Sequence, residues 1–153
     1  MMSPRPATAL PLRDAGPLLG APFRHPVRVY WEDTDAGGVV FYANYLKFFE
    51  RARTEWLRHL GFEQQAWREA TGAMFVVTDT QLRYRAPAKL DDLLHVTVVL
   101  RHGGKASMQI AQQAWRGDLL LAEGEVRIAC VGLDGSGGFR PRRIPEELLN
   151  LFA

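Results

Sequence analysis

The sequence predicts an α+β domain in which one long amphipathic helix packs against a curved antiparallel sheet. A strand-like alternation near residue 26 gives way to a helical pattern over about residues 42–60. Segments rich in Val, Thr and Tyr follow, connected by glycine turns. A long helix with an aromatic stripe has to bury that stripe, and consecutive strands provide a sheet face for it.

The first strand is expected to run from Pro26 to Glu32, where Val27, Val29 and Trp31 alternate with polar residues and predict one buried face. A turn or loop follows, because Asp and Gly favour turn conformations. The long helix then carries its apolar side chains at helical spacing and ends at a glycine. Its stripe consists of Tyr45, Phe48, Phe49, Ala52, Trp56 and Leu60.

The remaining elements are expected to be short. A second helix is expected at 63–70, with strands at 74–85, 93–101, 106–115 and 119–131. Two glycine-containing turns, at 103–104 and 117–118, predict hairpins and therefore favour an antiparallel meander. A loop is expected at 132–138, followed by a closing helix over Pro145–Leu149 with Pro in its first turn.

Composition limits the class of protein. The 153 residues suit one domain, and residues 1–25 contain five prolines, which predicts a flexible tail ahead of a domain at 26–153. The 19 basic and 17 acidic residues give a net charge of +2, which argues against a nucleic-acid-binding coat. No apolar run reaches the ~18 residues of a membrane span, and the interrupted N-terminal stretch is not typical of a secretory signal. We therefore expect a cytoplasmic protein.

Cysteine and histidine offer little metal or nucleophile chemistry. The single Cys130 makes no internal disulfide and lies in an apolar strand, which predicts a buried structural thiol. The four histidines show no metal-ligand spacing, so we expect no metal site.

The loop Glu32–Gly38 is the candidate for chemistry, because three carboxylates fall within four positions between a strand and a helix. One interpretation is a hydrophilic turn that caps the helix. The other is a hydrolytic centre. The helix has no acidic N-cap, so its first amides are available, and two glycines permit close approach of the backbone to a ligand. A carboxylate beside such amides can attack or activate water while the amides stabilise an oxyanion.

The run VRVYWEDTDAGGVVFYANYLKFFERARTEWLRHLGF resembles the opening segment of the 4-hydroxybenzoyl-CoA-thioesterase-like hotdog family, and within it the tol–pal-associated, YbgC-like acyl-CoA thioesterases. The resemblance continues more loosely through YRAPAKLDDLL and PRRIPEELL. It implies a hotdog fold, with the long helix wrapped by the sheet. It also implies hydrolysis of acyl-CoA thioesters, with short-chain or aromatic acyl groups. No metal or redox cofactor is implied, and coenzyme A enters only as part of the substrate.

The resemblance also assigns roles to residues of the loop. Asp35 corresponds to the family's catalytic aspartate, as nucleophile or general base, and the backbone amide of Tyr42 or its neighbour corresponds to the oxyanion donor. Gly37 and Gly38 shape the pocket. Many relatives carry His where this chain has Tyr42, so a His-dependent step does not carry over. The amide role survives, because any non-proline residue supplies an N–H group.

Further substrate-binding residues are expected outside these positions. Two basic groups suit the phosphates of coenzyme A, although ordinary solubilising charge is the alternative. The first flanks a glycine hairpin and the second precedes the last helix. The expected substrate-binding residues are Gly37, Gly38, Val39, Asn44, Thr78, Arg101, Lys105, Arg142 and Arg143.

Two acidic residues, one in the loop and one on the long helix, are expected to be non-catalytic. Asp33 is interpreted as ordering the loop, and Glu50 as part of a solvated helix face. Asn44 either orients the Asp35 loop or caps backbone groups. Phe75, Val77 and Thr78 are candidates for facing a neighbouring protomer's site.

The family's assembly implies partners and leaves alternatives. Two hotdog protomers pair their sheets edge to edge and form sites at the interface, so a homodimer or homotetramer is expected, with acyl carrier protein as a further possible partner. One alternative is an acyl dehydratase or hydratase of the same fold, which the D-T-D-A-G-G run does not fit. The other is a non-catalytic module that binds acyl-CoA or acyl carrier protein, which the Tyr42 departure keeps open.

Overall fold

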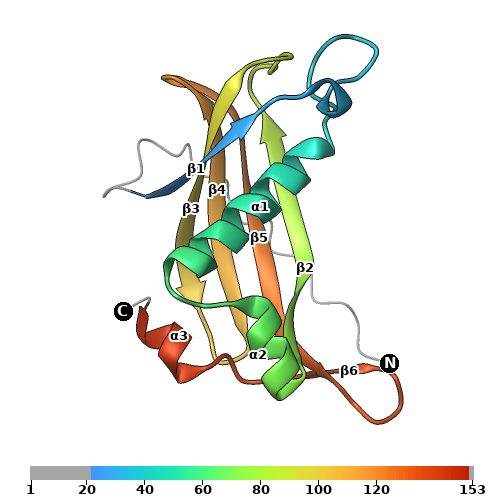
Figure 1. Ribbon diagram of the computed structural model, residues 1–153, viewed down its shortest axis with the longest axis vertical. Coiled ribbons are helices and arrows are strands. Elements are labelled where there is room, and N and C mark those ends of the chain that lie inside the picture. The colour runs from blue at the N-terminus through green and yellow to red at the C-terminus, as the bar shows by residue number, and fades with distance from the viewer. Residues whose placement is uncertain (1–21, 152–153) are drawn as a thin grey trace.

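The structure, a computed structural model, describes residues 22–151, and an antiparallel sheet wraps around one long helix in it (Figure 1). This arrangement confirms the α+β prediction. The strands are β1 (Phe23–Arg28), β2 (Ala73–Tyr84), β3 (Leu93–Gly103), β4 (Ser107–Arg116), β5 (Leu119–Leu133) and β6 (Phe139–Pro141). The helices are α1 (Asn44–His59), α2 (Gln64–Thr71) and α3 (Glu146–Leu151), with one short 3-10 turn, η1 (Trp31–Asp33).

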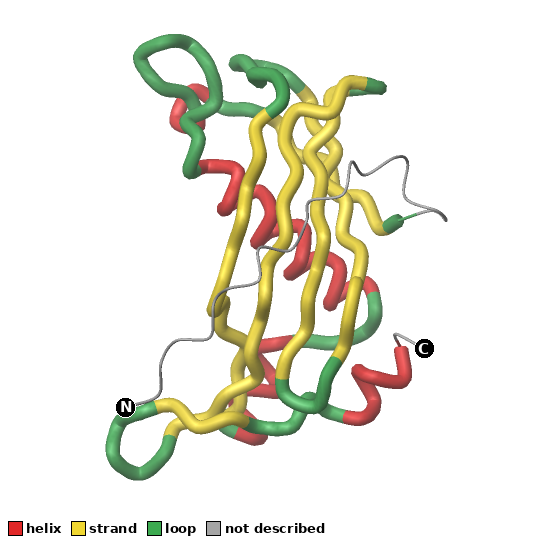
Figure 2. The backbone as a smooth tube through the Cα atoms, turned by 180° about the vertical axis from the view of Figure 1, so that it is seen from behind, coloured by secondary structure: helices red, strands yellow, loops and turns green. Residues whose placement is uncertain are grey.

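The sheet has the order β1-β3-β4-β5-β2, with β6 paired to the end of β5. All pairings are antiparallel, so the predicted hairpins between β3, β4 and β5 are confirmed. Figure 2 shows the strands side by side with α1 crossing behind them. The order leaves β1 and β2 as the two edges of the sheet.

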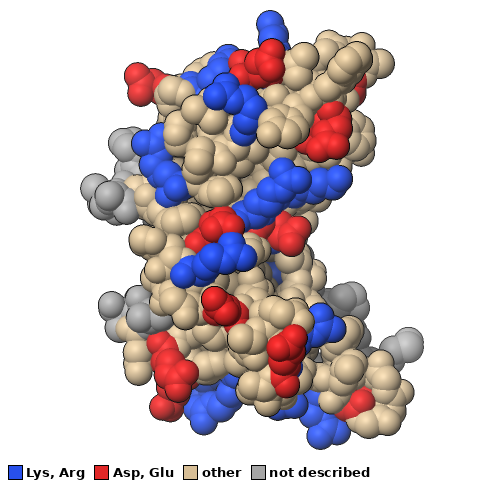
Figure 3. All heavy atoms as spheres, in the orientation of Figure 1, with Lys and Arg blue, Asp and Glu red and all other residues tan. Residues whose placement is uncertain are grey.

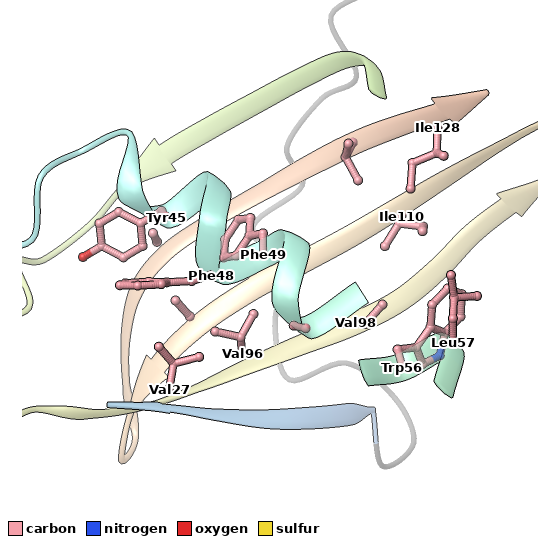
Figure 4. Close-up of a cluster of buried hydrophobic side chains, with 14 of the residues drawn as sticks. Val27, Tyr45, Phe48, Phe49, Trp56, Leu57, Val96, Val98, Ile110 and Ile128 are labelled. Carbon is pink, nitrogen blue, oxygen red and sulfur yellow. The ribbon is translucent and has the colours of Figure 1, made fainter. Parts of the chain in front are cut away.

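The aromatic stripe of α1 forms the centre of the core (Figure 4). Phe48 is fully buried, and the stripe residues from Tyr45 to Trp56 are buried with it, as the helical spacing predicts. Valines and isoleucines from β1, β3, β4 and β5 cover the stripe. Figure 4 labels them as Val27, Val96, Val98, Ile110 and Ile128. This packing fixes α1, and therefore its first turn, relative to the sheet.

The first strand differs from the prediction. β1 begins at Phe23, which packs against the core, and ends at Arg28, so the predicted domain boundary at residue 25 falls inside a strand. Residues 1–21, the rest of the predicted tail, lie outside the described residues. Trp31, expected on the buried face, is 82% exposed. The reason is local, because the backbone N–H of Asp33 donates to Tyr30 O over 3.0 Å and turns the chain out of the sheet.

The C-terminal region also contains a strand that the sequence did not predict. β6 pairs with residues 131–133 of β5, where a loop over 132–138 was expected. The loop is shorter than expected because Asp134 closes it, with Oδ1 accepting from the N–H groups of Ser136 and Gly138 at 2.9 and 3.0 Å. The two short helices are confirmed, and α2 is capped at its C-terminus by Gly72, which has a left-handed φ of 73°.

Candidate active site

Asp33 organises the loop between β1 and α1. Its side chain is buried, and Oδ2 accepts a hydrogen bond from Tyr30 N–H at 2.8 Å. Its backbone carbonyl accepts two more, from Phe41 N–H at 2.9 Å and from Asn44 Nδ2 at 2.7 Å. The interpretation of Asp33 as a loop-ordering residue fits these contacts. Asn44 orients the loop through a side-chain bond.

Asp35 lies in a narrow turn with its side chain exposed. Its N–H donates to Val39 O at 2.9 Å, and its carbonyl accepts from Gly38 N–H at 3.0 Å. The carboxylate Oδ1 accepts from Gly37 N–H at 2.8 Å, which fixes the side chain over the turn. Gly38 has φ of +79°, a conformation that favours glycine. A Cβ at Gly37 would lie 3.2 Å from Asp35 Oδ1. The two glycines therefore allow both the turn and the position of the carboxylate.

The β2–β3 connection supports this turn from behind. Val40 N–H donates to Ala88 O at 2.9 Å, and an isolated bridge joins Val39 to Lys89. Val39 was predicted to bind substrate. It is half-buried and holds the loop against this connection.

Asp92 fixes the connection itself. Its Oδ2 accepts from Lys89 N–H at 2.9 Å and from the Arg116 guanidinium at 2.7 Å. Burial opposes ionisation of this carboxyl, but the two hydrogen bonds outweigh it and hold the pKa of Asp92 below its usual value. Arg116 also donates to Pro87 O at 3.2 Å, so one guanidinium braces both ends of the connection.

Backbone N–H groups are available where the chain enters α1. Within the described residues, the N–H groups of Tyr42 and Ala43 have no hydrogen-bond acceptor, whereas those of Phe41 and Asn44 do. Ala43 is the N-cap, with no side-chain cap, and the first turn of α1 holds no acidic residue. Such N–H groups at the positive end of a helix dipole favour a negative charge. They follow the Asp35 turn by only a few residues, so a carboxylate and oxyanion donors lie on one short segment.

Tyr84 contacts the same segment, and sequence reasoning did not single it out. Its hydroxyl donates to the backbone carbonyl of Tyr42 at 2.8 Å. The ring packs against Tyr45 and edge-on to Tyr42, with centroid separations of 5.6 and 6.4 Å. Tyr84 ends β2 directly before RAPAKLDDLL, so its position at the start of the more loosely matched segment is the only signal that the sequence offers.

A cavity of about 430 Å³ lies between α1 and the strands β2, β4 and β5. Apolar side chains from all four elements line most of it. Arg53 lies at its wall and donates to Gln112 Oε1 at 2.8 Å, while Gln112 donates to Phe49 O at 3.0 Å. Burial lowers the pKa of Arg53, and the nearby Glu50 opposes this effect. Glu50 is exposed, as the prediction of a solvated face requires, but it also lines the cavity.

The residues predicted from the edge strand do not join the Asp35 turn. Phe75 and Val77 line the cavity, and Thr78 lies at an irregularity in the pairing of β2 with β5. The Thr78 hydroxyl donates to Asp79 Oδ2 at 3.0 Å, with its side chain exposed. These residues lie on an open sheet edge.

The two basic groups meet each other at the opposite end of the sheet from the Asp35 turn (Figure 1). Ile144 N–H donates to Lys105 O at 2.8 Å, which joins the segment after β6 to the β3–β4 turn. The Arg142 guanidinium donates to Thr71 O at 3.3 Å, at the end of α2. Arg143 supplies a carbonyl near the Cys130 thiol, at 3.6 Å, while Arg101 is exposed on β3. Within one protomer these cations lie far from Asp35.

Other chemistry is sparse in the part of the chain that the structure describes. Cys130 is fully buried, as predicted, and burial raises the pKa of its thiol. Across residues 22–151 no group of three or more His, Cys, Asp and Glu side chains is arranged to hold a metal ion. None of the helices in that range is long and apolar enough to cross a membrane.

Positive and negative side chains are intermixed on the face that carries α1 (Figure 3).

The chain belongs to the thioesterase-like superfamily, whose family model matches residues 29–152. It is 45% identical over 135 residues to an acyl-CoA thioesterase YbgC from Haemophilus influenzae, which covers 88% of this chain and 97% of the relative. It is 44% identical over 131 residues to an acyl-CoA thioester hydrolase YbgC from Escherichia coli O157:H7, with 85% and 95% covered. The family resemblance drawn from the sequence is therefore confirmed.

Solved structures agree on the fold. A probable thioesterase from Bartonella henselae has a TM-score of 0.73 and 34% identity, and the match covers 82% of this chain and all of that one. A 4-hydroxybenzoyl-CoA thioesterase variant in complex with 4-hydroxybenzoyl-CoA has a TM-score of 0.79 at 18% identity, with 85% and 97% covered. The hotdog fold expected from the sequence is confirmed.

Proposed function

We propose that this chain hydrolyses acyl-CoA thioesters to the free acid and coenzyme A at the Asp35 turn. The observation that carries the proposal is the pairing of an exposed carboxylate, fixed by the Gly37 N–H, with the N–H groups of Tyr42 and Ala43 on the same segment, which have no acceptor among residues 22–151. The names of the YbgC relatives support the reaction class.

The geometry suits thioester chemistry. The carbonyl oxygen of the thioester accepts from the Tyr42 and Ala43 amides, which stabilise the negative charge of the tetrahedral intermediate. Asp35 acts in one of two ways. As a nucleophile it forms an acyl-carboxylate anhydride and expels the thiolate, and water then hydrolyses the anhydride. As a general base it takes a proton from the attacking water. Because a thiolate leaves readily, neither route demands a strong general acid, and the absence of His at position 42 is tolerated.

The cavity between α1 and β2 is the proposed site of the acyl group. Its volume of about 430 Å³ falls within the usual range of small-molecule pockets, and its lining is mostly apolar. A short-chain or aromatic acyl group suits this space.

The sheet edge supports a homodimer. β2 is an edge strand that pairs with β5 on one side only and carries a run of exposed residues, and such edges need a cover. Two β2 strands paired antiparallel about a two-fold axis would continue the sheet and set one protomer's basic end beside its partner's Asp35 turn. β3 alone has 11 residues and spans roughly 35 Å, so one protomer's basic groups do not reach its own Asp35. Arg101, Lys105, Arg142 and Arg143 are therefore proposed to hold the coenzyme A phosphates of the partner's site.

Three expectations complete the proposal. The reaction uses no metal or redox cofactor, because a carboxylate and backbone amides supply its chemistry. The protein acts in the cytoplasm, where acyl-CoA and acyl carrier protein are both available as acyl donors. A homotetramer of two such dimers is the larger assembly proposed.

Thiol release from a panel of acyl-CoA substrates tests the function. The wild-type protein should release thiol. The kcat of Asp35→Asn and of Asp35→Ala should be at least about 100-fold lower, as is usual when an enzyme loses a catalytic side chain. Asp118→Asn, at an exposed turn between β4 and β5, is the matched control and should retain activity. An Asp35→Asn variant as fast as wild type would contradict the mechanism. Binding of coenzyme A without turnover by the wild type would favour a binding module instead.

A further inference from the structure

The Tyr84 hydroxyl binds a carbonyl that α1 leaves unused. In the first turn, Leu46 N–H donates to Ala43 O at 3.1 Å, so no helical N–H reaches the Tyr42 carbonyl among the described residues. Tyr84 supplies a donor to that carbonyl from the end of β2, at 2.8 Å. A side chain of the sheet therefore completes the hydrogen bonding of the backbone where α1 begins.

Each of the two proposed oxyanion donors belongs to a peptide group held by its carbonyl. The Tyr42 N–H shares a peptide group with the Phe41 carbonyl, which accepts from Asn44 N–H at 2.8 Å. The Ala43 N–H shares one with the Tyr42 carbonyl, which accepts from Tyr84. A trans peptide group is planar, with its C=O and N–H pointing in opposite directions. Fixing the carbonyl therefore fixes the direction of the N–H.

We propose that Tyr84 is a positioning residue for the oxyanion hole. Its hydroxyl sets the direction of the Ala43 N–H and polarises it through the shared peptide group, without touching the substrate. This inference rests on the proposed function and adds to it the side chain that orients the second of the two oxyanion donors, the Ala43 N–H.

The position of the hydroxyl is itself fixed from two sides. Tyr84 pairs with Ala122 in the sheet, and its ring packs on Tyr45, which is only 3% exposed. Burial, and next the proximity of Tyr42, raise the pKa of Tyr84 above its usual value. The hydroxyl is therefore protonated, and able to donate, at the near-neutral pH of a thioester assay.

The first test removes only the hydroxyl. Tyr84→Phe should lower kcat about tenfold with KM within about twofold, because a misdirected donor weakens binding of the transition state more than binding of the substrate. Tyr30→Phe is the matched control, since Tyr30 is 61% exposed at the same end of the molecule, and it should keep the wild-type kcat. An unchanged kcat in Tyr84→Phe would overturn the proposal.

The second test asks whether Tyr84 acts through the Ala43 N–H. Ala43→Pro deletes that N–H at a φ of −74°, which proline adopts, and should cost about 100-fold in kcat. In this background Tyr84→Phe should cost nothing more, because its target is already absent. A tenfold loss from Tyr84→Phe in both backgrounds would assign Tyr84 another role.

The third measurement does not depend on turnover. The ¹H and ¹⁵N resonances of the Ala43 amide should move in Tyr84→Phe, while those of the Gly135 amide, in the turn before β6, stay in place. An unmoved Ala43 amide would overturn the inference whatever the activity. A wild-type protein that releases no thiol from any acyl-CoA would overturn the proposed function instead, and the amide resonances would still decide whether Tyr84 orients this peptide group.

Discussion

The side chain of Asn44 donates from Nδ2 to the backbone carbonyl of Asp33 at 2.7 Å, and this bond joins the first turn of α1 to the loop that carries Asp35. The proposed oxyanion donors lie where the chain enters α1, and the carboxylate lies on the loop. The Asn44 side-chain amide therefore links the two parts of the proposed catalytic site.

Asn44→Ala should remove the link between the oxyanion donors and the loop that carries Asp35. We expect a loss of about 1 kcal/mol in the free energy of unfolding, typical of one hydrogen bond, and a fall in kcat of roughly tenfold because the geometry loosens. Chemical denaturation and thiol-release kinetics measure the two effects. Asn150→Ala, at an exposed site on α3, is the control and should alter neither. A kcat equal to wild type would show that this bond does not position the oxyanion donors relative to Asp35.

The two glycines of the Asp35 turn should fail in different ways. Gly38→Ala places a side chain at φ of +79° and should cost about 1–2 kcal/mol of stability. Gly37→Ala has no such strain, but its Cβ would lie 3.2 Å from Asp35 Oδ1 and should displace the carboxylate, so kcat falls more than stability does. Gly135→Ala, with open space around its Cβ, is the control. Identical profiles for Gly37→Ala and Gly38→Ala would contradict this distinction.

Asp92 should make stability depend on acid pH. Because its pKa is depressed in the folded state, the carboxylate contributes stability above the unfolded pKa of about 3.9, and this contribution is lost as the pH falls through the folded pKa. Asp92→Asn lacks the contribution. Its melting temperature should therefore lie below wild type at pH 7 and approach it below about pH 4. Asp91→Asn is the neighbouring control, since Asn tolerates the φ of 73° at this position. A constant difference in melting temperature from pH 7 to pH 3 would contradict the role of Asp92.

Cys130 should be silent in a thiol assay of the native protein. It is fully buried and burial raises the pKa of its thiol, so both access and thiolate content are low. Ellman's reagent at pH 8 should label no thiol before unfolding and one per chain afterwards. Colour in a thioester assay would then report released coenzyme A alone. Labelling of the native chain at the rate of free cysteine would show that the thiol is accessible.

The sequence was sufficient for the elements that periodicity controls. The helical spacing from Tyr45 to Trp56 predicted the buried stripe of α1, and glycine turns predicted the hairpins of β3, β4 and β5. It was insufficient at Trp31, where the alternation suggested a strand. There, the hydrogen bonds of Asp33 to Tyr30 are short-range polar contacts that a hydrophobic pattern does not encode.

In the candidate site, too, the residues that are close in sequence could be predicted and the one brought in by sheet pairing could not. Asp35, Gly37, Gly38, Tyr42 and Asn44 are close in sequence, and the structure brings them together. Tyr84 lies 42 residues beyond Tyr42, and only the register of β2 against β5 brings its hydroxyl to that carbonyl. Contacts across a sheet depend on pairing and on bulges, which one sequence does not specify.

The distance between the Asp35 turn and the basic end of the same protomer has a consequence for mixtures of defective chains. If each site takes its carboxylate from one chain and its phosphate-binding arginines from the other, lesions at the two ends should complement each other. An inactive Asp35→Ala chain and a weak Arg142→Ala/Arg143→Ala chain, unfolded together and refolded at equal amounts, should form mixed dimers in which one site carries both lesions and the other carries neither. Such a mixture should exceed the summed activity of its components, whereas chains that complete their sites alone would gain nothing from a partner.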